Sequence, residues 1–203
     1  MLVIGLCGGS GSGKGEVGRL FSENGIPVID TDVVYREITS KASECLTALV
    51  NEFGSEILTE DGRLDRHKLA RTVFSGVGAA ERRFRLNEIT HKFILDQTRR
   101  KLSDFESEGF AAAAVDAPLL FESGFDGECD KTVCVLADRN IRIARITERD
   151  GITQNEAEKR IDSQIPDTKL RELCDYTLVN NGTVDCLRAS VLQVVHDILK
   201  NER

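Results

Sequence analysis

No apolar run in the sequence approaches membrane-spanning length, so we expect no membrane partner. The N-terminus lacks a basic segment followed by an apolar signal core, because glycine and lysine interrupt the first apolar run at once. None of the six cysteines forms a Cys-x-x-Cys pair, which argues against zinc, and without a secretion signal we expect reduced thiols in a cytoplasmic protein. Excess positive charge is also missing: the net charge of −7 predicts no general affinity for nucleic acid.

What remains is the composition of a globular protein. Hydrophobic residues make up 40% of the chain and charged residues 30%, and no internal repeat or low-complexity tract is present. A length of 203 residues is enough for one sizeable core with an insertion or a lid.

The first stretch of the chain carries its most specific motif. Residues 2–7 are an apolar run of strand character, a glycine-rich loop follows, and residues 16–24 are compatible with a helix. Gly8, four further residues, Gly13 and Lys14 fit the spacing of a phosphate-binding loop. Glycines let successive backbone N–H groups point into one hollow, the helix start adds its positive dipole end, and Lys14 adds a full charge. The alternative, a glycine-rich surface turn, does not explain the lysine and the preceding strand.

We therefore expect this loop to bind the phosphates of ATP. The candidate ATP-binding residues are Gly9, Ser10, Gly11, Ser12, Gly13, Lys14, Gly15 and Glu16. One position departs from the motif: a hydroxyl residue normally follows the lysine and holds Mg²⁺, and here Gly15 and then the anionic Glu16 follow instead.

Carboxylates end two further apolar segments. Residues 26–32 read as a short strand that finishes with Asp30 and Asp32, and residues 111–116 as a buried strand that finishes with Asp116. The carboxyl ends of parallel strands are where ligands bind, so these acids are candidate metal-water ligands or bases. The alternative role for Asp30 and Asp32 is that of a helix cap. For Asp32 we favour the functional role, and for Asp30 the functional role and the cap role are equally supported.

Two helical blocks interrupt the strand pattern. Residues 33–108 have helical spacing and many basic side chains, which either meet an anionic substrate or are a solvated surface. Residues 139–149 place Arg142, Arg145 and Arg149 on one helix face, which favours a lid over phosphates rather than a solvated stripe. Thr153 and Glu156 form a capping box for the next helix, which Pro166 ends.

The alternation of strands and helices predicts an α/β fold. Residues 131–137 and 174–179 are the remaining strands, and the last helix, residues 184–199, has a core stripe at 184, 187, 191, 195 and 198. We expect a P-loop NTPase-type three-layer αβα fold with a five-stranded parallel sheet. The nucleotide-binding core would comprise residues 1–32, 109–138 and 170–203, with a helical acceptor region at 33–108 and a lid at 139–169.

The chain resembles the dephospho-CoA kinases nearly from end to end. The resemblance rests on the glycine loop, Val28-Ile-Asp-Thr-Asp32, Leu86-Asn-Glu-Ile-Thr-His91, Pro118-Leu-Leu-Phe-Glu122 and Arg149-Asp-Gly151. It continues through Arg160, Gln164, Lys169, Asp175 and Asn180-Asn-Gly182. It implies ATP-dependent phosphorylation of the 3′-hydroxyl of dephospho-CoA, the last step of coenzyme A synthesis, with ATP as co-substrate and Mg²⁺ as cofactor.

The resemblance also implies roles for single residues. Lys14, Asp32 and Arg149 would be catalytic, with Asp32 taking or orienting the proton of the attacking hydroxyl. Arg145 and either Asn180 or Asn181 would bind ATP, the asparagine near its adenine. The acceptor would meet Asp32, His91, Leu120 and Glu122, and the metal would meet Asp32 and Asp116, directly or through water. Besides Gly15 and Glu16, the chain departs from the family at Lys92, where proline is usual, and at Cys7, where threonine is frequent.

Two other functions stay open at this point. One is a kinase of the same fold that phosphorylates another small hydroxyl compound, such as a nucleoside or nucleotide. The other is an ATP-binding protein whose phosphoryl transfer is weakened because Gly15 and Glu16 replace Ser-Thr.

Overall fold

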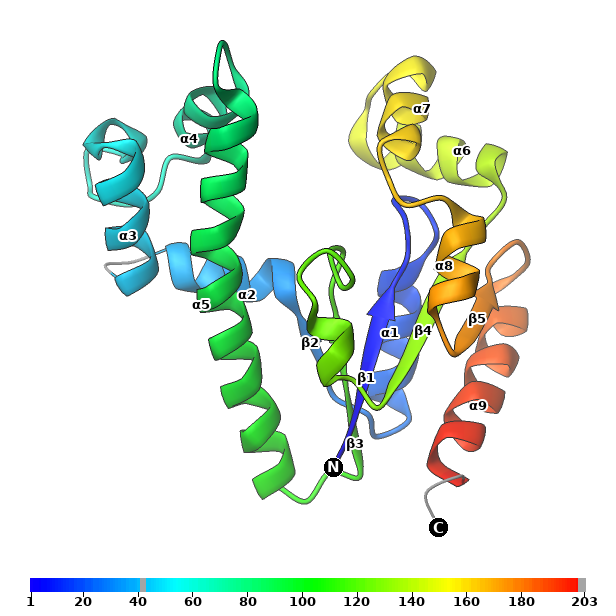
Figure 1. Cartoon of the computed structure of the whole chain (residues 1–203). Helices are drawn as coiled ribbons and strands as arrows, with labels where there is room; N and C mark the ends of the chain where they lie inside the picture. The colour runs from blue at the N-terminus through cyan, green and yellow to red at the C-terminus, as the bar shows by residue number, and fades with distance from the viewer. Residues whose placement is uncertain (41–42, 201–203) are drawn as a thin grey trace. The chain divides into compact units, whose positions relative to one another are not determined.

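The computed structural model describes residues 1–40 and 43–200 (Figure 1). The chain divides into two compact units. The core unit is formed by residues 1–29 and by the chain from Leu102 onward, and the helical unit by Asp30–Lys101. Each unit has its own hydrophobic core.

A parallel sheet of five strands forms the centre of the core unit, as the sequence predicts. The strand order is β2-β3-β1-β4-β5, so the strand before the glycine loop is central (Figure 1). In chain order the strands are β1 (Leu2–Cys7), β2 (Val28–Asp30), β3 (Ala112–Asp116), β4 (Lys131–Leu136) and β5 (Tyr176–Val179). The register pairs Leu6 with Asp116 and Cys7 with Cys134, which brings the carboxyl ends of β1, β3 and β4 to one edge.

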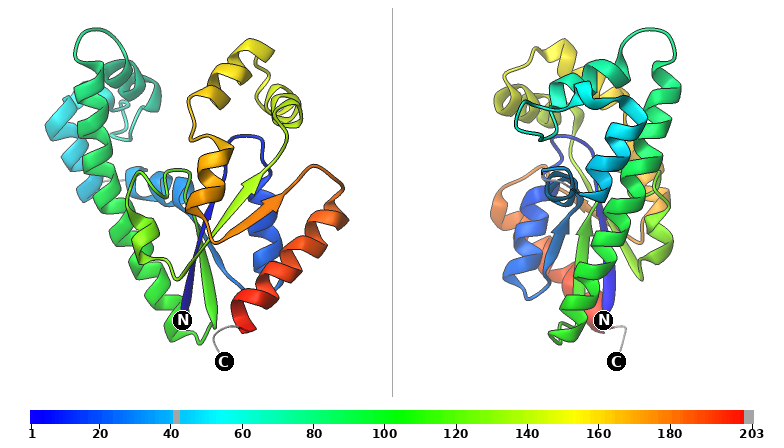
Figure 2. Two further views of the ribbon diagram at one scale, coloured as in Figure 1. Left: turned by 45° about the vertical axis from the view of Figure 1, so that its right-hand side comes forward. Right: turned by 90° about the vertical axis from the view of Figure 1, so that its left-hand side faces the viewer.

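Helices α1 (Lys14–Glu23) and α9 (Val184–Lys200) pack on one face of this sheet and against each other (Figure 2). Alternate residues of the strands, such as Ile4 and Leu6, meet them in the main core. The stripe expected on the last helix is confirmed at 187, 191, 195 and 198 but is wrong at Val184. Val184 is the first residue of α9 and is 52% exposed, so the buried stripe begins one turn later.

The other face of the sheet is covered by the segment after β3 and by a short helix. A Cβ on Gly5 would lie 2.9 Å from both the Leu120 side chain and the Cys129 sulfur, so this segment packs directly on the strand backbone. The segment contains the 3-10 helix η2 (Phe125–Glu128). Helix α8 (Asp167–Leu173), which the sequence pattern does not predict, begins directly after Pro166. Pro166 is the N-cap residue of α8. The preceding helix α7 (Gln154–Asp162) already ends at Asp162 with its C-cap at Ser163, so the expectation that Pro166 ends that helix is wrong. Elements on both faces complete the three layers.

Helices α6 (Arg139–Asp150) and α7 (Gln154–Asp162) form a hairpin within the core unit. The predicted capping box of Thr153 and Glu156 is present at the start of α7. The hairpin has a small core of its own, in which Ile146, Ala157 and Ile161 are buried. The hairpin lies at the sheet edge that carries the glycine loop, where Arg142 of α6 donates to Ser10 O.

The helical unit has almost no strand structure, as expected. Its helices are α2 (Thr31–Thr39), α3 (Glu44–Phe53), η1 (Ser55–Ile57), α4 (Arg66–Phe74) and the greater part of α5 (Ala79–Ser107). They enclose a core that includes Leu49, Phe53, Ile57 and Val73. Among the described residues of both units, no helix is long and apolar enough to cross a membrane. All six cysteines carry free thiols.

Candidate active site

The glycine loop connects β1 to α1 and is shaped by contacts that exclude side chains. Gly13 caps α1 with φ 91° and ψ 23°, a left-handed conformation that glycine adopts without strain. A Cβ at this position would lie 2.0 Å from Asn180 Nδ2. Glycine at residue 13 is thus required both by the backbone turn and by the side chain behind it. The Ser12 hydroxyl is buried beneath the loop and has no hydrogen-bond partner among the described residues.

Lys14 follows as the first residue of α1, and its ammonium group pairs with the carboxylate of Asp116. The lysine side chain is 16% exposed and the aspartate side chain 10%. Asp116 ends β3, the strand beside β1, so the parallel register delivers an acid to the lysine from 102 residues along the chain. The structure thus brings together two of the predicted site residues.

Gly15 stands in open space on the exposed side of the first turn of α1. A Cβ there would meet no heavy atom within 4 Å, so the turn has room for a side chain. Glu16 is turned into the helix surface: Arg19 donates from Nε to Oε2 at 3.0 Å and from Nη2 to Oε1 at 2.5 Å. The hydrogen bond from Arg19 lowers the pKa of the Glu16 carboxyl below its usual range. The negative charge next to the loop is therefore balanced locally.

Arg145 and Asn180 donate hydrogen bonds to the backbone of the glycine loop. Arg145 donates to the carbonyl oxygens of Gly11, Ser12 and Asn180 at 3.2 to 3.4 Å. The Asn180 amide is buried and donates to Ser12 O at 2.9 Å. The side-chain oxygen Oδ1 of Asn181 instead accepts from the backbone N–H of Asp138 at 2.8 Å. Both asparagines have structural partners, and a contact of either with adenine stays a prediction.

Arg149 lies at the end of α6, and its side chain is 60% exposed. Its guanidinium makes a bidentate pair with the neighbouring Asp150: Nε donates to Oδ1 at 2.7 Å and Nη2 donates to Oδ2 at 2.9 Å. Asp150 also accepts from Arg160. These bonds, the one from Arg149 foremost, lower the pKa of Asp150 to about 2. Arg149 is held in this structure by a carboxylate, the kind of planar anion for which its fork is suited.

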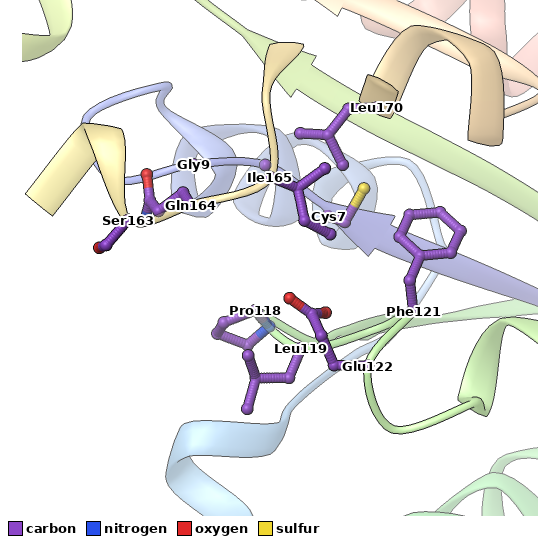
Figure 3. Close-up of a pocket in the computed structure, with 11 residues that line it drawn as sticks. Cys7, Gly9, Pro118, Leu119, Phe121, Glu122, Ser163, Gln164, Ile165 and Leu170 are labelled. Carbon is purple, nitrogen blue, oxygen red and sulfur yellow. The ribbon is translucent and has the colours of Figure 1, made fainter. Parts of the chain in front are cut away.

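A cavity of about 280 Å³ opens beside the first glycines of the loop (Figure 3). The 118–122 segment and the 163–165 segment form facing walls, and the Glu122 carboxylate stands between them. The lining residues are Cys7, Gly8, Gly9, Pro118, Leu119, Phe121, Glu122, Ser163, Gln164, Ile165 and Leu170. Leu120, a predicted acceptor contact, lies in the core at 1% exposure, and its neighbours Leu119 and Phe121 line the cavity.

The helical unit contains the remaining candidates. The Asp30 carboxylate caps α2 by accepting from the N–H groups of Asp32 and Val33 at 2.8 and 3.2 Å. The cap reading of Asp30 is therefore confirmed. Asp32 lies in the first turn of α2 with its side chain exposed, and His91 is half-buried on α5. Several basic residues of this unit have structural roles: Arg82, for example, donates to the carbonyls of Thr72, Ser75 and Val77.

Sequence reasoning assigned no role to Gln164 and placed Arg142 only in a stripe. In the structure both touch the glycine loop: Gln164 Oε1 accepts from Ser10 N, and Arg142 Nε donates to Ser10 O. The helical stripe pointed to Arg142, and the signal for Gln164 was its place among the residues that carry the family resemblance.

A glycine loop that closes on a lysine at the carboxyl edge of a parallel sheet, with an acid of the adjacent strand on that lysine, defines the class of P-loop kinases. The chain belongs, within this class, to the dephospho-CoA kinase family, whose model matches residues 2–185. A dephospho-CoA kinase of Corynebacterium glutamicum is 39% identical over 198 residues, which cover 98% of this chain and 100% of that protein.

Solved structures agree in fold. The protein TT1252 from Thermus thermophilus superposes with a TM-score of 0.79 at 29% identity, and 97% of each chain is covered. A dephospho-CoA kinase from Campylobacter jejuni gives 0.72 at 22% identity, with 99% of this chain and 98% of that chain covered. The predicted three-layer fold with a parallel sheet is thereby confirmed.

Proposed function

We propose that this protein transfers the γ-phosphoryl group of ATP to the 3′-hydroxyl of dephospho-CoA, giving coenzyme A and ADP. The observation that carries the proposal is the Lys14–Asp116 pair beneath a complete glycine loop, in a chain that matches the family over nearly its whole length. Phosphoryl transfer asks the protein for little covalent chemistry, so its residues act by positioning and charge.

The residues have distinct roles in this proposal. Backbone N–H groups of the loop from Gly11 to Gly15 hold the phosphates, and Lys14 leaves Asp116 to meet the β- and γ-phosphates when they arrive. Arg149 exchanges Asp150 for the transferring group, whose oxygens it can meet with two donors. Asp32 accepts or orients the proton of the attacking hydroxyl.

The cavity beside Gly8 and Gly9 is our candidate for the part of the acceptor that lies next to the loop. Its walls combine apolar side chains, from Leu119, Phe121 and Ile165, with the polar groups of Glu122, Ser163 and Gln164. Such a mixture suits a flat ring or a chain that carries hydroxyl or amide groups. Glu122 would accept a hydrogen bond from the acceptor and orient it.

One assay decides between the proposal and its two alternatives. ADP release is measured with ATP and, in turn, dephospho-CoA, adenosine and nucleoside monophosphates. We expect turnover with dephospho-CoA far above that with the others. A preference for a nucleoside or nucleotide would assign a different kinase, and ATP binding without ADP release for any acceptor would indicate loss of phosphoryl transfer.

The donor chemistry of the chain fits Mg²⁺, which takes one or two carboxylates and keeps several waters. Asp116 and Asp32 are the acids that would hold the ion or its waters, and Gly15 adds only backbone. When bound with ATP, Mg²⁺ neutralises phosphate charge. Because Glu16 is already paired with Arg19, we do not assign it to the metal.

Gly15→Ser should restore the missing hydroxyl. The position has room for a side chain, so the fold is expected to be unchanged. We predict that kcat/KM rises by about tenfold, equivalent to ~1.4 kcal/mol, and that half-maximal rate needs less Mg²⁺. The measurement is a Mg²⁺ titration of ADP release. Gly15→Ala is the matched control, since it adds the Cβ without the hydroxyl; equal curves for serine and alanine would refute a metal role for this position.

Arg149→Lys should lower kcat by about tenfold or more, because an ammonium group cannot meet two phosphate oxygens in one plane. Arg139→Lys is the matched control on the same helix: Arg139 forks onto Asp162 at 2.6 and 3.1 Å as Arg149 does onto Asp150. We expect parent kinetics for the control. Parent kcat in Arg149→Lys as well would place Arg149 outside the reaction.

A further inference from the structure

The backbone of Ser10, inside the glycine loop, is bound at both its N–H and its carbonyl group by side chains from the α6–α8 region. Its N–H donates to Gln164 Oε1 at 3.1 Å, and its carbonyl oxygen accepts from Arg142 Nε at 2.9 Å. The two partners are bonded to each other, Arg142 Nη2 to Gln164 Oε1 at 2.7 Å. Ser10, Arg142 and Gln164 therefore form a closed ring of three hydrogen bonds, which we name the Ser10 clamp.

The clamp is built with little freedom. Arg142 is 4% exposed, and its remaining nitrogen, Nη1, donates to Asp167 Oδ1 at 2.9 Å, so the buried charge is compensated. Gln164 Oε1 faces two donors, which uses both lone pairs of the amide oxygen and fixes the orientation of the amide. A closed ring in which each member is bonded to the other two restricts all three to one geometry.

The loop glycines show how close the clamp lies. A Cβ on Gly9 would fall 2.2 Å from Arg142 Nη2 and 2.7 Å from Gln164 Oε1. A Cβ on Gly11 would fall 2.7 Å from the carbonyl oxygen of Arg142. Glycine at these positions therefore leaves the space that the Ser10 clamp occupies, and it also lets a phosphate approach the loop backbone closely.

Gln164 also lines the cavity that we assign to the acceptor, together with Gly9. Figure 3 shows Gln164 and Ser163 on the wall that includes Gly9, opposite Pro118 and Glu122. A single side chain therefore meets both the ATP-binding loop and the neighbouring cavity.

We propose that Gln164 and Arg142 are positioning residues for ATP, which hold the Ser10 peptide so that the following loop N–H groups are already aimed at the phosphates. The proposal rests on the proposed function, since it assumes that the loop binds ATP. A loop fixed before binding loses less conformational freedom when the nucleotide arrives. Removing the clamp should therefore weaken ATP binding more than it slows the step that follows.

The test compares Gln164→Leu, which keeps the size of the side chain without an acceptor, with Gln164→Glu, which keeps the acceptor oxygen. We expect the leucine variant to raise KM for ATP and Kd for ADP by about tenfold to thirtyfold, the value of one to two hydrogen bonds. The glutamate variant should stay nearer the parent. Gln154→Leu is the matched control, because Gln154 is exposed on α7 and its side-chain amide donates to Glu158 at 2.8 Å, away from the glycine loop.

Arg142→Lys and the double variant test whether the two residues act as one unit. Lysine cannot reach Ser10 O, Gln164 and Asp167 together, so the single variant should also raise Kd for ADP. Because both changes break the same ring, the double variant should be little worse than the poorer single one.

To distinguish a positioning role from a merely structural one, we measure the Kd for ADP by calorimetry and the KM for ATP by kinetics, both below the melting temperature of each variant. Lower melting temperature with unchanged Kd and KM would overturn the positioning role, as would a glutamate variant as poor as leucine. If the parent protein itself bound no adenine nucleotide, the proposed function would fail instead.

Discussion

Lys14→Ala should lower kcat by about 10²–10³-fold, a loss of about 3–4 kcal/mol of transition-state stabilisation, while the protein stays folded. The lysine charge is expected to count most when negative charge moves between the β- and γ-phosphates. In the structure the Lys14 ammonium group already lies at the loop, where it pairs with Asp116, and the lysine side chain is 16% exposed. The measurement is kcat from ADP release, with circular dichroism to show that the fold is retained.

The alanine variant also leaves Asp116 without its cation, which could cost stability. Lys14→Gln addresses this, because an amide can still donate to the Asp116 carboxylate without carrying charge. Both variants should be equally slow if the charge matters. Lys169→Ala is the matched control, an exposed lysine of the same unit whose partner is Glu172 at 3.2 Å. A kcat within a few-fold of the parent in either Lys14 variant would contradict the role.

Asp32→Asn should lower kcat by about 10²–10⁴-fold and leave ATP affinity nearly unchanged, because asparagine keeps the shape of aspartate but cannot accept a proton. The structure gives this prediction a matched control two residues away. Asp30 caps α2 through its carboxylate, and asparagine caps helices about as well as aspartate. Asp30→Asn should therefore keep both stability and kcat.

The two outcomes for Asp32 differ in what they change. Loss of kcat with the Kd for ATP preserved supports a role at the attacking hydroxyl. Loss of ATP affinity with kcat preserved would make Asp32 a nucleotide contact, and parent behaviour in both would remove it from the site.

The sequence by itself determined the fold class, the glycine loop and most elements. These features are local: a strand or a helix shows itself in the spacing of its apolar residues, and a phosphate-binding loop is made from one continuous stretch of backbone. The capping box at Thr153 and the buried positions of α9 from Leu187 onward were readable for the same reason. Val184 was misjudged because periodicity does not show where a helix meets the sheet.

Only the tertiary structure decided the partners of the polar side chains. Lys14 meets Asp116 across 102 residues, and Ser10 meets Gln164 across 154, because the strand order and the α6–α8 segment bring them together. The sequence pattern also did not predict helix α8 or the burial of Leu120. A hydrogen bond depends on position and direction in space, and the spacing of residues along the chain specifies neither for groups on different elements.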